Sequence, residues 1–228
     1  MTTGRTASIH ARLLNRAKER GEDFNLLLTR YGIERFLYRL SQLPAREVML
    51  LKGALLFDLW FDVPHRPTRD ADFLGFGPMD AEALAATIRD ICVVAVDDGM
   101  VFDPDSITVE EIREDARYGG LRVKLLGKLG NARVTLQLDV GYGDAVTPGP
   151  EEAEYPTLLE DMPAPRLRVY PRASVVAEKL EAIVSLGMAN SRMKDYFDLR
   201  AMAREGALDE ELLGEAVAAT FGRRNTEV

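Results

Sequence analysis

Two aspartates separated by one residue, Asp70 and Asp72, precede the apolar run 73-FLGF-76. On a strand, residues i and i+2 point to the same face, so the two carboxylates would lie close together. Neighbouring carboxylates resist simultaneous ionisation unless a cation compensates them. Mg²⁺ prefers oxygen ligands and usually shares its shell with substrate phosphates. The pair therefore indicates a site for one or two divalent cations. The alternative is an exposed edge strand whose outward positions are acidic.

A third carboxylate, Asp139, lies in the alternating segment 135-TLQLDVGYG-143 and shares a face with Thr135 and Gln137. It could complete a metal site or deprotonate an attacking hydroxyl. A solvent-facing strand residue is the alternative. Further upstream, Gly53 follows a short apolar run and precedes an apolar helix pattern. A glycine at a strand-to-helix turn lets backbone N–H groups approach phosphates.

Two charged residues near the C-terminus border apolar helix faces. Lys179 lies at the edge of an apolar stripe that we expect to face the core: Val176, Leu180, Ile183, Val184 and Leu186. Asp195 lies beside Leu199 and Met202 at helical spacing. The alternatives are a lysine whose stem covers apolar surface, and an aspartate that pairs with Arg192 or Arg200 or with the helix dipole.

Arg66 and Arg69 flank the paired aspartates. Arginine suits phosphate oxygens, so these side chains could steady a triphosphate. Local neutralisation of the two carboxylates is the alternative.

The pattern of the chain predicts an α+β fold: N-terminal helices, a small mixed sheet, and a C-terminal helical lobe. The turn signal Gly130-Asn131 joins two alternating segments and predicts a β-hairpin. We expect one domain over residues 1–146 and a second over 147–228, with a cleft between them.

The predicted elements are, in chain order, helices within 7–43, a strand over 47–51, a helix over 54–61, a loop over 62–69 and a strand over 70–75. A helix over 79–91 that Asp80 caps, strands within 100–142 and a loop over 147–166 follow. The chain then continues with a strand over 167–170 and helices over 173–186, 191–204 and 209–221.

Composition narrows the class of protein. The 228-residue chain has a formal net charge of −8, which argues against a protein that coats nucleic acid non-specifically. A single cysteine, Cys92, excludes an intramolecular disulfide and a cysteine zinc site. The two histidines, His10 and His65, are too few for a histidine metal cluster. No segment has the length and composition of a signal peptide or membrane span, so we expect a soluble, cytoplasmic protein.

The chain contains a glycine turn at Gly53, then a strand with the paired aspartates, then a strand with Asp139. This order of motifs resembles the nucleotidyltransferase superfamily related to DNA polymerase β. Four segments, two of which contain the glycine turn and the paired aspartates, resemble the AbiEii/AbiGii toxin family, which includes the MenT-type nucleotidyltransferase toxins. They are 50-LLKGALLFDLW-60, 66-RPTRDADF-73, 178-EKLEAIVSLG-187 and 191-SRMKDYFDL-199. The helical opening over 12–41 is also similar to that family, and the resemblance covers the chain to about residue 205.

The resemblance implies roles for individual residues. Asp70 and Asp72 match the metal-binding pair, and Thr68 matches the hydroxyl residue before it. Lys179 matches a lysine that acts at the triphosphate or active site, and Asp195 matches the acidic residue of the last motif.

Gly53 matches the phosphate-approaching turn. Ala54 departs from the family, where glycine or serine is usual, so a hydroxyl contact is lost there. Ala71 is smaller than the usual aliphatic residue between the aspartates. The polymerase β superfamily pattern implies that Asp139 is the third acid of the site.

By resemblance, the chain is a Mg²⁺-dependent nucleotidyltransferase toxin that moves NMP from an NTP to the 3′ end of tRNA. A cognate antitoxin would accompany it, in a toxin–antitoxin or abortive-infection system. Two other functions stay open. One is an aminoglycoside-type adenylyltransferase, for which the acidic chain would suit a cationic acceptor. The other is a non-catalytic nucleotide-binding module.

Overall fold

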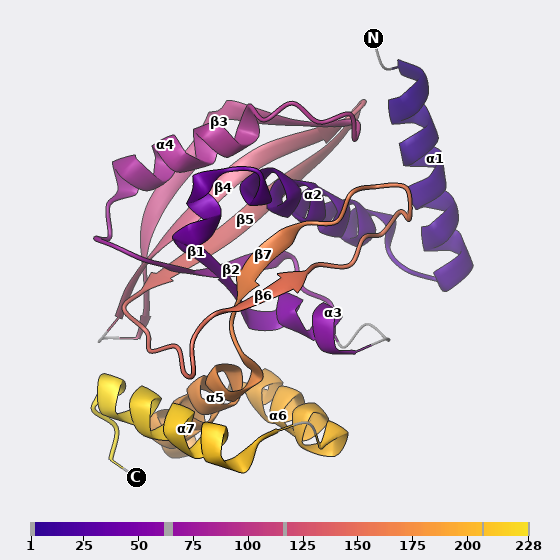
Figure 1. Ribbon diagram of the computed structural model, residues 1–228. Helices are drawn as coiled ribbons and strands as arrows, with labels where there is room; N and C mark the ends of the chain where they lie inside the picture. The colour runs from indigo at the N-terminus through magenta and orange to yellow at the C-terminus, as the bar shows by residue number, and fades with distance from the viewer. Residues whose placement is uncertain (1–2, 62–65, 116–117, 207, 228) are drawn as a thin grey trace. The chain divides into compact units, whose positions relative to one another are not determined.

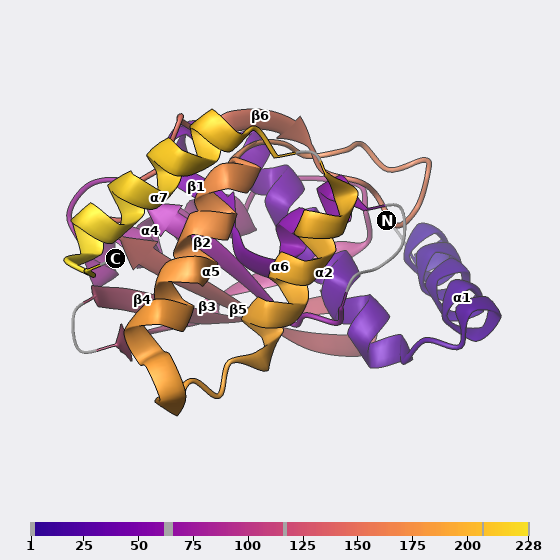
Figure 2. The same cartoon turned by 90° about the horizontal axis from the view of Figure 1, so that it is seen from below.

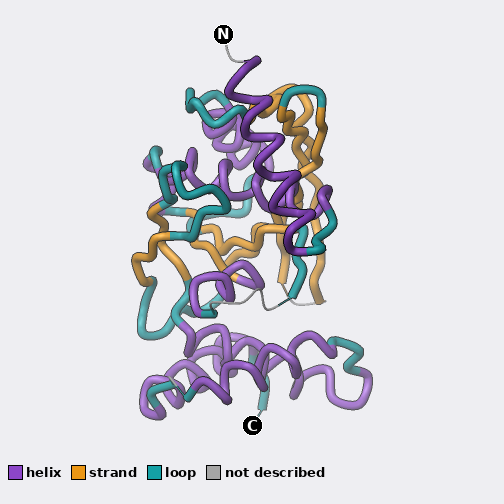
Figure 3. The backbone as a smooth tube through the Cα atoms, turned by 90° about the vertical axis from the view of Figure 1, so that its right-hand side faces the viewer, coloured by secondary structure: helices purple, strands orange, loops and turns teal. Residues whose placement is uncertain are grey.

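The protein was analysed as a computed structural model that describes residues 3–61, 66–115, 118–206 and 208–227. The chain divides into two compact units. Unit 1 comprises Met1–Tyr142 and Glu152–Arg168, and unit 2 comprises Gly143–Glu151 and Val169–Val228. Strands and helices mix in unit 1, whereas three helices make up most of unit 2 (Figure 3). His65 lies outside the described residues.

Unit 1 begins with the two helices that the sequence predicts, α1 (Thr3–Arg20) and α2 (Phe24–Ser41). Asp23 caps α2 because its side chain accepts a hydrogen bond from the backbone N–H of Leu26 at 2.8 Å. Most of α2 is buried, and its apolar side chains form the centre of the core of unit 1.

Within the described residues, seven strands form one mixed sheet in the order β3-β4-β5-β2-β1-β7-β6 (Figure 1). The β4–β5 pair is the predicted hairpin, and its turn lies at Gly130-Asn131. The β2–β5 pair is parallel, and the β1–β2, β3–β4 and β4–β5 pairs are antiparallel. The strands are β1 (Met49–Lys52), β2 (Asp70–Gly75), β3 (Met100–Asp115), β4 (Tyr118–Leu129), β5 (Ala132–Tyr142), β6 (Glu151–Glu154) and β7 (Arg166–Val169).

Strand β6 corrects one prediction, because the segment 147–166 is not a loop throughout. Its residues are mostly exposed and acidic, so no alternation of apolar side chains marks it as a strand. It forms by backbone pairing with β7 at the edge of the sheet.

Short helical elements connect the strands. Two 3₁₀ turns, Pro44–Glu47 and Gly53–Leu56, flank β1. The predicted helix over 54–61 is therefore a 3₁₀ turn followed by the short α3 (Phe57–Trp60). Helix α4 (Ala81–Cys92) has the predicted cap, since Asp80 accepts hydrogen bonds from two backbone N–H groups of its first turn.

Helix α2 packs on β5 and helix α4 packs on β3, and alternation along β5 decides which of its side chains α2 covers. Leu136 and Leu138 are fully buried, and a Cβ at Gly32 of α2 would lie 3.1 Å from Leu136 Cδ2. Gln137 and Asp139 point to the opposite face because side chains alternate along a strand. The face away from α2 is thus the one that carries the polar residues.

Unit 2 contains α5 (Arg172–Leu186), the 3₁₀ turn Gly187–Ala189, α6 (Met193–Glu205) and α7 (Glu210–Arg224). Figure 2 shows α5 between α6 and α7. The apolar stripe predicted on α5 is partly wrong: Val184 is 50% exposed, whereas Glu181 is buried. Glu181 is accommodated there because Arg224 and Thr226 donate hydrogen bonds to its carboxylate.

Candidate active site

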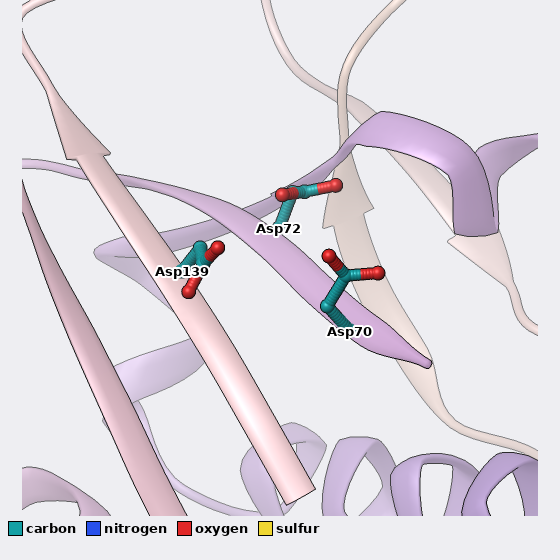
Figure 4. Close-up of side chains that lie close together, drawn as sticks. All are labelled: Asp70, Asp72 and Asp139. Atoms are coloured by element: carbon teal, nitrogen blue, oxygen red, sulfur yellow. The ribbon is translucent and has the colours of Figure 1, made fainter. Parts of the chain in front are cut away.

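Three carboxylates converge on the polar face of the sheet. Asp70 and Asp72 project from β2, and Asp139 projects from the neighbouring β5 (Figure 4). One oxygen from each carboxylate lies within 4.8 Å of the others. The parallel pairing of β2 with β5 produces this cluster, because its register sets Asp72 directly beside Asp139. The expectation that Asp70 and Asp72 share a face is confirmed.

The strand registers extend this pair into a row of four charged residues. Lys52 on β1 is opposite Asp72, and Arg122 on β4 is opposite Asp139. Residues opposite one another on adjacent strands place their side chains on the same face of the sheet. Two basic residues therefore flank two acidic residues across β1, β2, β5 and β4, which lowers the cost of the like charges at the centre.

Arg122 holds Asp139 by two hydrogen bonds. Its Nε donates to Oδ1 at 2.8 Å and its Nη2 donates to Oδ2 at 2.7 Å, a bidentate ion pair. Gln137 Nε2 donates a longer bond of 3.3 Å to Oδ2. The hydrogen bond with the carboxylate also raises the pKa of Arg122. Asp139 is 7% exposed, so it is not the solvent-facing residue that the sequence left as an alternative.

The sequence analysis gave Arg122 no role, although the hairpin contains a signal for it. The two-residue turn pairs Leu129 with Ala132, so residues equally far from the turn face one another. Counting along both strands from that pair reaches Arg122 opposite Asp139. An arginine opposite a candidate catalytic aspartate is a recognisable feature once the register is fixed.

Two predicted residues contact the paired aspartates. Thr68 donates a hydrogen bond from Oγ1 to Asp70 Oδ1 at 2.7 Å. Gly53 lies against Asp72 with φ +75°, and a Cβ added at Gly53 would collide with the Asp72 carboxylate. Gly53 thus has a positive φ and a close neighbour, both of which favour glycine. Arg66, two residues before Thr68, is half-buried, and Arg69 is exposed.

These residues fit a divalent cation. Three carboxylates supply hard oxygen ligands, and their oxygens are close enough to bind one ion or a pair of ions. Thr68 and Arg122 each fix the orientation of one carboxylate, which is what the outer partners of metal ligands do.

Lys179 and Asp195 belong to a second cluster, in unit 2. Lys179 Nζ donates to Asp195 Oδ1 at 3.0 Å and to Asp198 Oδ2 at 2.7 Å. Asp195 also forms the ion pair with Arg192 that the sequence left as an alternative, at 2.9 Å. Both aspartates are buried.

Asp198 is a member of this cluster that the sequence analysis missed. It follows Asp195 by three residues on α6, a spacing that puts both carboxylates on one face of a helix. Asp70, Asp72, Asp139, Gly53 and Thr68 are brought together in unit 1, and Lys179 with Asp195 in unit 2.

The mixed sheet with its clustered carboxylates fits a nucleotidyltransferase, and the family match shows that the chain is one. Residues 35–228 match the family described as nucleotidyl transferase AbiEii toxin, type IV toxin–antitoxin system. The chain belongs to the AbiEii family and is thereby the toxin type of nucleotidyltransferase that the sequence resemblance predicts.

Two solved structures from Helicobacter pylori match much of this chain. JHP933 shares 17% sequence identity at a TM-score of 0.50, and the match covers 86% of this chain and 78% of JHP933. A provisionally assigned nucleotidyltransferase shares 20% identity at a TM-score of 0.47, with coverages of 78% and 68%. No curated protein matches the chain. Among the described residues, no helix has the length and apolar character needed to cross a membrane.

Proposed function

We propose that this enzyme transfers a nucleoside monophosphate from an NTP to the 3′ hydroxyl of an RNA, with tRNA as the first candidate, in a Mg²⁺-dependent reaction. The observation that carries this proposal is the cluster of Asp70, Asp72 and Asp139. Asp70, Asp72 and Asp139 would hold Mg²⁺, which when bound would neutralise charge on the NTP phosphates.

The side chains around the cluster position its carboxylates. Thr68 orients Asp70 by its hydrogen bond, and Arg122 keeps Asp139 in one orientation through two bonds. The Gly53 turn leaves room for the Asp72 carboxylate. Because these carboxylates are already held in place, they need little reorientation during the reaction. A preorganised site stabilises the transition state electrostatically in this way.

Further residues are assigned to the substrates. We assign Arg66 and Lys179 to the triphosphate, because a guanidinium or an ammonium pairs with phosphate oxygens. Asp139 or Asp195 would orient the acceptor hydroxyl and take up its proton. The acceptor oxygen forms a bond to the α-phosphorus, the bond from the α-phosphorus to the bridging oxygen breaks, and pyrophosphate leaves. No covalent enzyme intermediate is required.

Membership of the AbiEii family makes the chain a component of a toxin–antitoxin system. On this proposal, modification of tRNA 3′ ends arrests growth or aborts phage infection, and a cognate antitoxin protein relieves the effect. On this proposal the reaction takes place in the cytoplasm, where NTPs and tRNA are found.

A second candidate keeps the reaction and changes the acceptor. The net charge of −8 favours a cationic small molecule, such as an aminoglycoside, over a polyanion. The acceptor would then be adenylylated, and RNA would carry no label.

The test is incubation of the protein with Mg²⁺, each labelled NTP in turn, and either total tRNA or a set of aminoglycosides. Label on tRNA with wild type, and none with Asp70→Asn, supports the proposal. Label only on a small acceptor supports the second candidate. Equal labelling of tRNA with and without Mg²⁺ would contradict the assigned role of the three carboxylates.

A further inference from the structure

Helix α6 of unit 2 has two chemically different sides. The inner side carries the buried residues Asp195, Asp198 and Met202. The outer side begins with three large exposed side chains: Met193 is 69% exposed, Tyr196 43% and Phe197 48%. Large apolar side chains grouped on one exposed face usually mark a binding surface.

Two arginines continue the outer side along the helix. Positions 193, 196, 197, 200 and 204 follow the i, i+3, i+4, i+7 and i+11 spacing of a single helix face. Arg200 and Arg204 are both exposed. We call Met193, Tyr196, Phe197, Arg200 and Arg204 the α6 stripe. It is about 16 Å long, at 1.5 Å per residue.

The charges of α6 are segregated between its sides. Asp195 and Asp198 are turned inward and hydrogen bonded to Lys179. Glu205 at the end of the helix pairs with Arg172 at 2.9 Å. The exposed face is therefore locally positive in a chain whose net charge is −8. An anionic partner is attracted to this face and is repelled by the net negative charge of the rest of the chain.

We propose that the α6 stripe binds a single-stranded RNA end, with bases stacked on Tyr196 and Phe197 and phosphates paired with Arg200 and Arg204. Aromatic side chains combined with cations are the feature by which proteins hold unpaired nucleic acid. Every base has a flat face, so such a surface tolerates any sequence at the RNA end. This inference rests on the proposed transfer to an RNA 3′ end and assigns the surface that holds that acceptor.

A protein partner is less well matched to this stripe. Tyr, Phe, Met and Arg are enriched at protein interfaces too, so residue type fits either partner. What favours RNA is the arrangement, in which two rings are followed by two cations along one helix face. Mixed aromatic and basic character along a narrow line suits a chain of bases and phosphates better.

The test compares two fluorescent RNA hairpins, one with a four-nucleotide single-stranded 3′ tail and one blunt, by anisotropy without NTP. Tyr196→Ala/Phe197→Ala should weaken binding of the tailed RNA at least tenfold and leave binding of the blunt RNA unchanged. The matched control is Phe76→Ala, which removes a ring that is 43% exposed in unit 1. It should bind the tailed RNA as wild type does.

The cationic half of the stripe has its own readout. For the tailed RNA, log K falls as log salt rises. Arg200→Gln/Arg204→Gln should make this slope shallower by about 1.4, because each phosphate contact on a single strand contributes about 0.7. Arg89→Gln removes an exposed arginine of α4 and should leave the slope unchanged. All substituted side chains are exposed, so thermal unfolding midpoints should stay close to that of wild type.

Failure of the inference and failure of the proposed function are distinguishable. If wild type labels no RNA in the transfer assay, the proposed function fails. If wild type labels RNA and the ring variant labels it with the same KM, only the stripe is refuted. A ring variant that keeps RNA binding but no longer co-purifies with its antitoxin would also overturn the inference, because the face would then be a protein interface.

Discussion

Replacement of Gly53 by alanine should impair catalysis far more than it impairs folding. Gly53 has φ +75°, and an added Cβ would lie 2.8 Å from Cβ and 2.7 Å from Cγ of Asp72. Rotation of the Asp72 side chain cannot relieve the contact between the two Cβ atoms, since Cβ does not move when χ1 changes. The Asp72 carboxylate must therefore shift together with its backbone on β2.

The two effects of this substitution differ in size. Alanine at positive φ costs about 1–2 kcal/mol of folding free energy. For a chain of this length, each 1 kcal/mol lowers the unfolding midpoint by about 2–4 °C. Displacement of a catalytic group by about 1 Å costs on the order of 100-fold in rate. We therefore expect a loss of about 100-fold in kcat with a fall in Tm of about 2–8 °C from the backbone strain, to which the collision with Asp72 adds.

Gly21→Ala is the matched control, because Gly21 has φ +65° and no atom within 4 Å of an added Cβ. The two variants share the backbone strain and differ in the collision with Asp72. The assay is pyrophosphate release at saturating NTP over a Mg²⁺ titration, with Tm measured in parallel. Equal kcat values for Gly53→Ala and Gly21→Ala would refute the argument that this glycine makes room for the carboxylate.

Three further predictions concern other charged groups. Arg122→Gln should raise the Mg²⁺ concentration needed for half-maximal activity 10- to 100-fold, because Asp139 loses both of its bonds to the guanidinium. Lys179→Met should lower the free energy of unfolding in urea by about 3 kcal/mol, because it removes the ammonium that pairs with two buried carboxylates, of which Asp195 keeps Arg192 as a second cation. Burial raises the pKa of Glu34 to about 7 from 4.5, so the folded protein retains a proton that the unfolded chain releases between these values. Stability should therefore fall by up to about 3 kcal/mol between pH 4.5 and pH 7, and Glu34→Gln should flatten this fall.

Each of these predictions has an outcome that contradicts it. An unchanged Mg²⁺ requirement in Arg122→Gln, with Tm also unchanged, would mean that the arginine does not position Asp139. Lys179→Met with wild-type stability would show that the lysine does not compensate the buried carboxylates of Asp195 and Asp198. If the free energy of unfolding of wild type rises with pH from 4.5 to 7 while that of Glu34→Gln does not, the sign assigned to Glu34 is wrong.

The sequence predicted those parts of the fold that are determined by local signals, such as turn residues, caps and the alternation of apolar side chains. The hairpin around Gly130-Asn131 combines a two-residue turn signal with alternation on both strands, and it forms as predicted. Asp80 precedes a helix at a capping position, and the predicted cap is present. The proximity of Asp70 and Asp72 follows from the two-residue repeat of a strand alone.

Features that depend on pairing between distant segments were not predictable in the same way. Asp139 joins the paired aspartates through the parallel register of β2 and β5, which no local pattern specifies. Strand β6 forms by pairing at a sheet edge and has no apolar alternation. Glu181 is buried on α5 because Arg224, which is 43 residues away, supplies the compensating charge. In each case a long-range partner decides the outcome, and a single sequence does not identify it.

The central claim is that the carboxylates of Asp70, Asp72 and Asp139 support transfer of NMP to RNA. The most direct measurement runs two parallel reactions, one with NTP labelled at the α-phosphate and one with NTP labelled at the γ-phosphate, and follows both labels. The account predicts α-label on the 3′ end of RNA and γ-label in pyrophosphate, with both signals lost in Asp70→Asn. Appearance of γ-label on RNA, or undiminished α-labelling by Asp70→Asn, would contradict it.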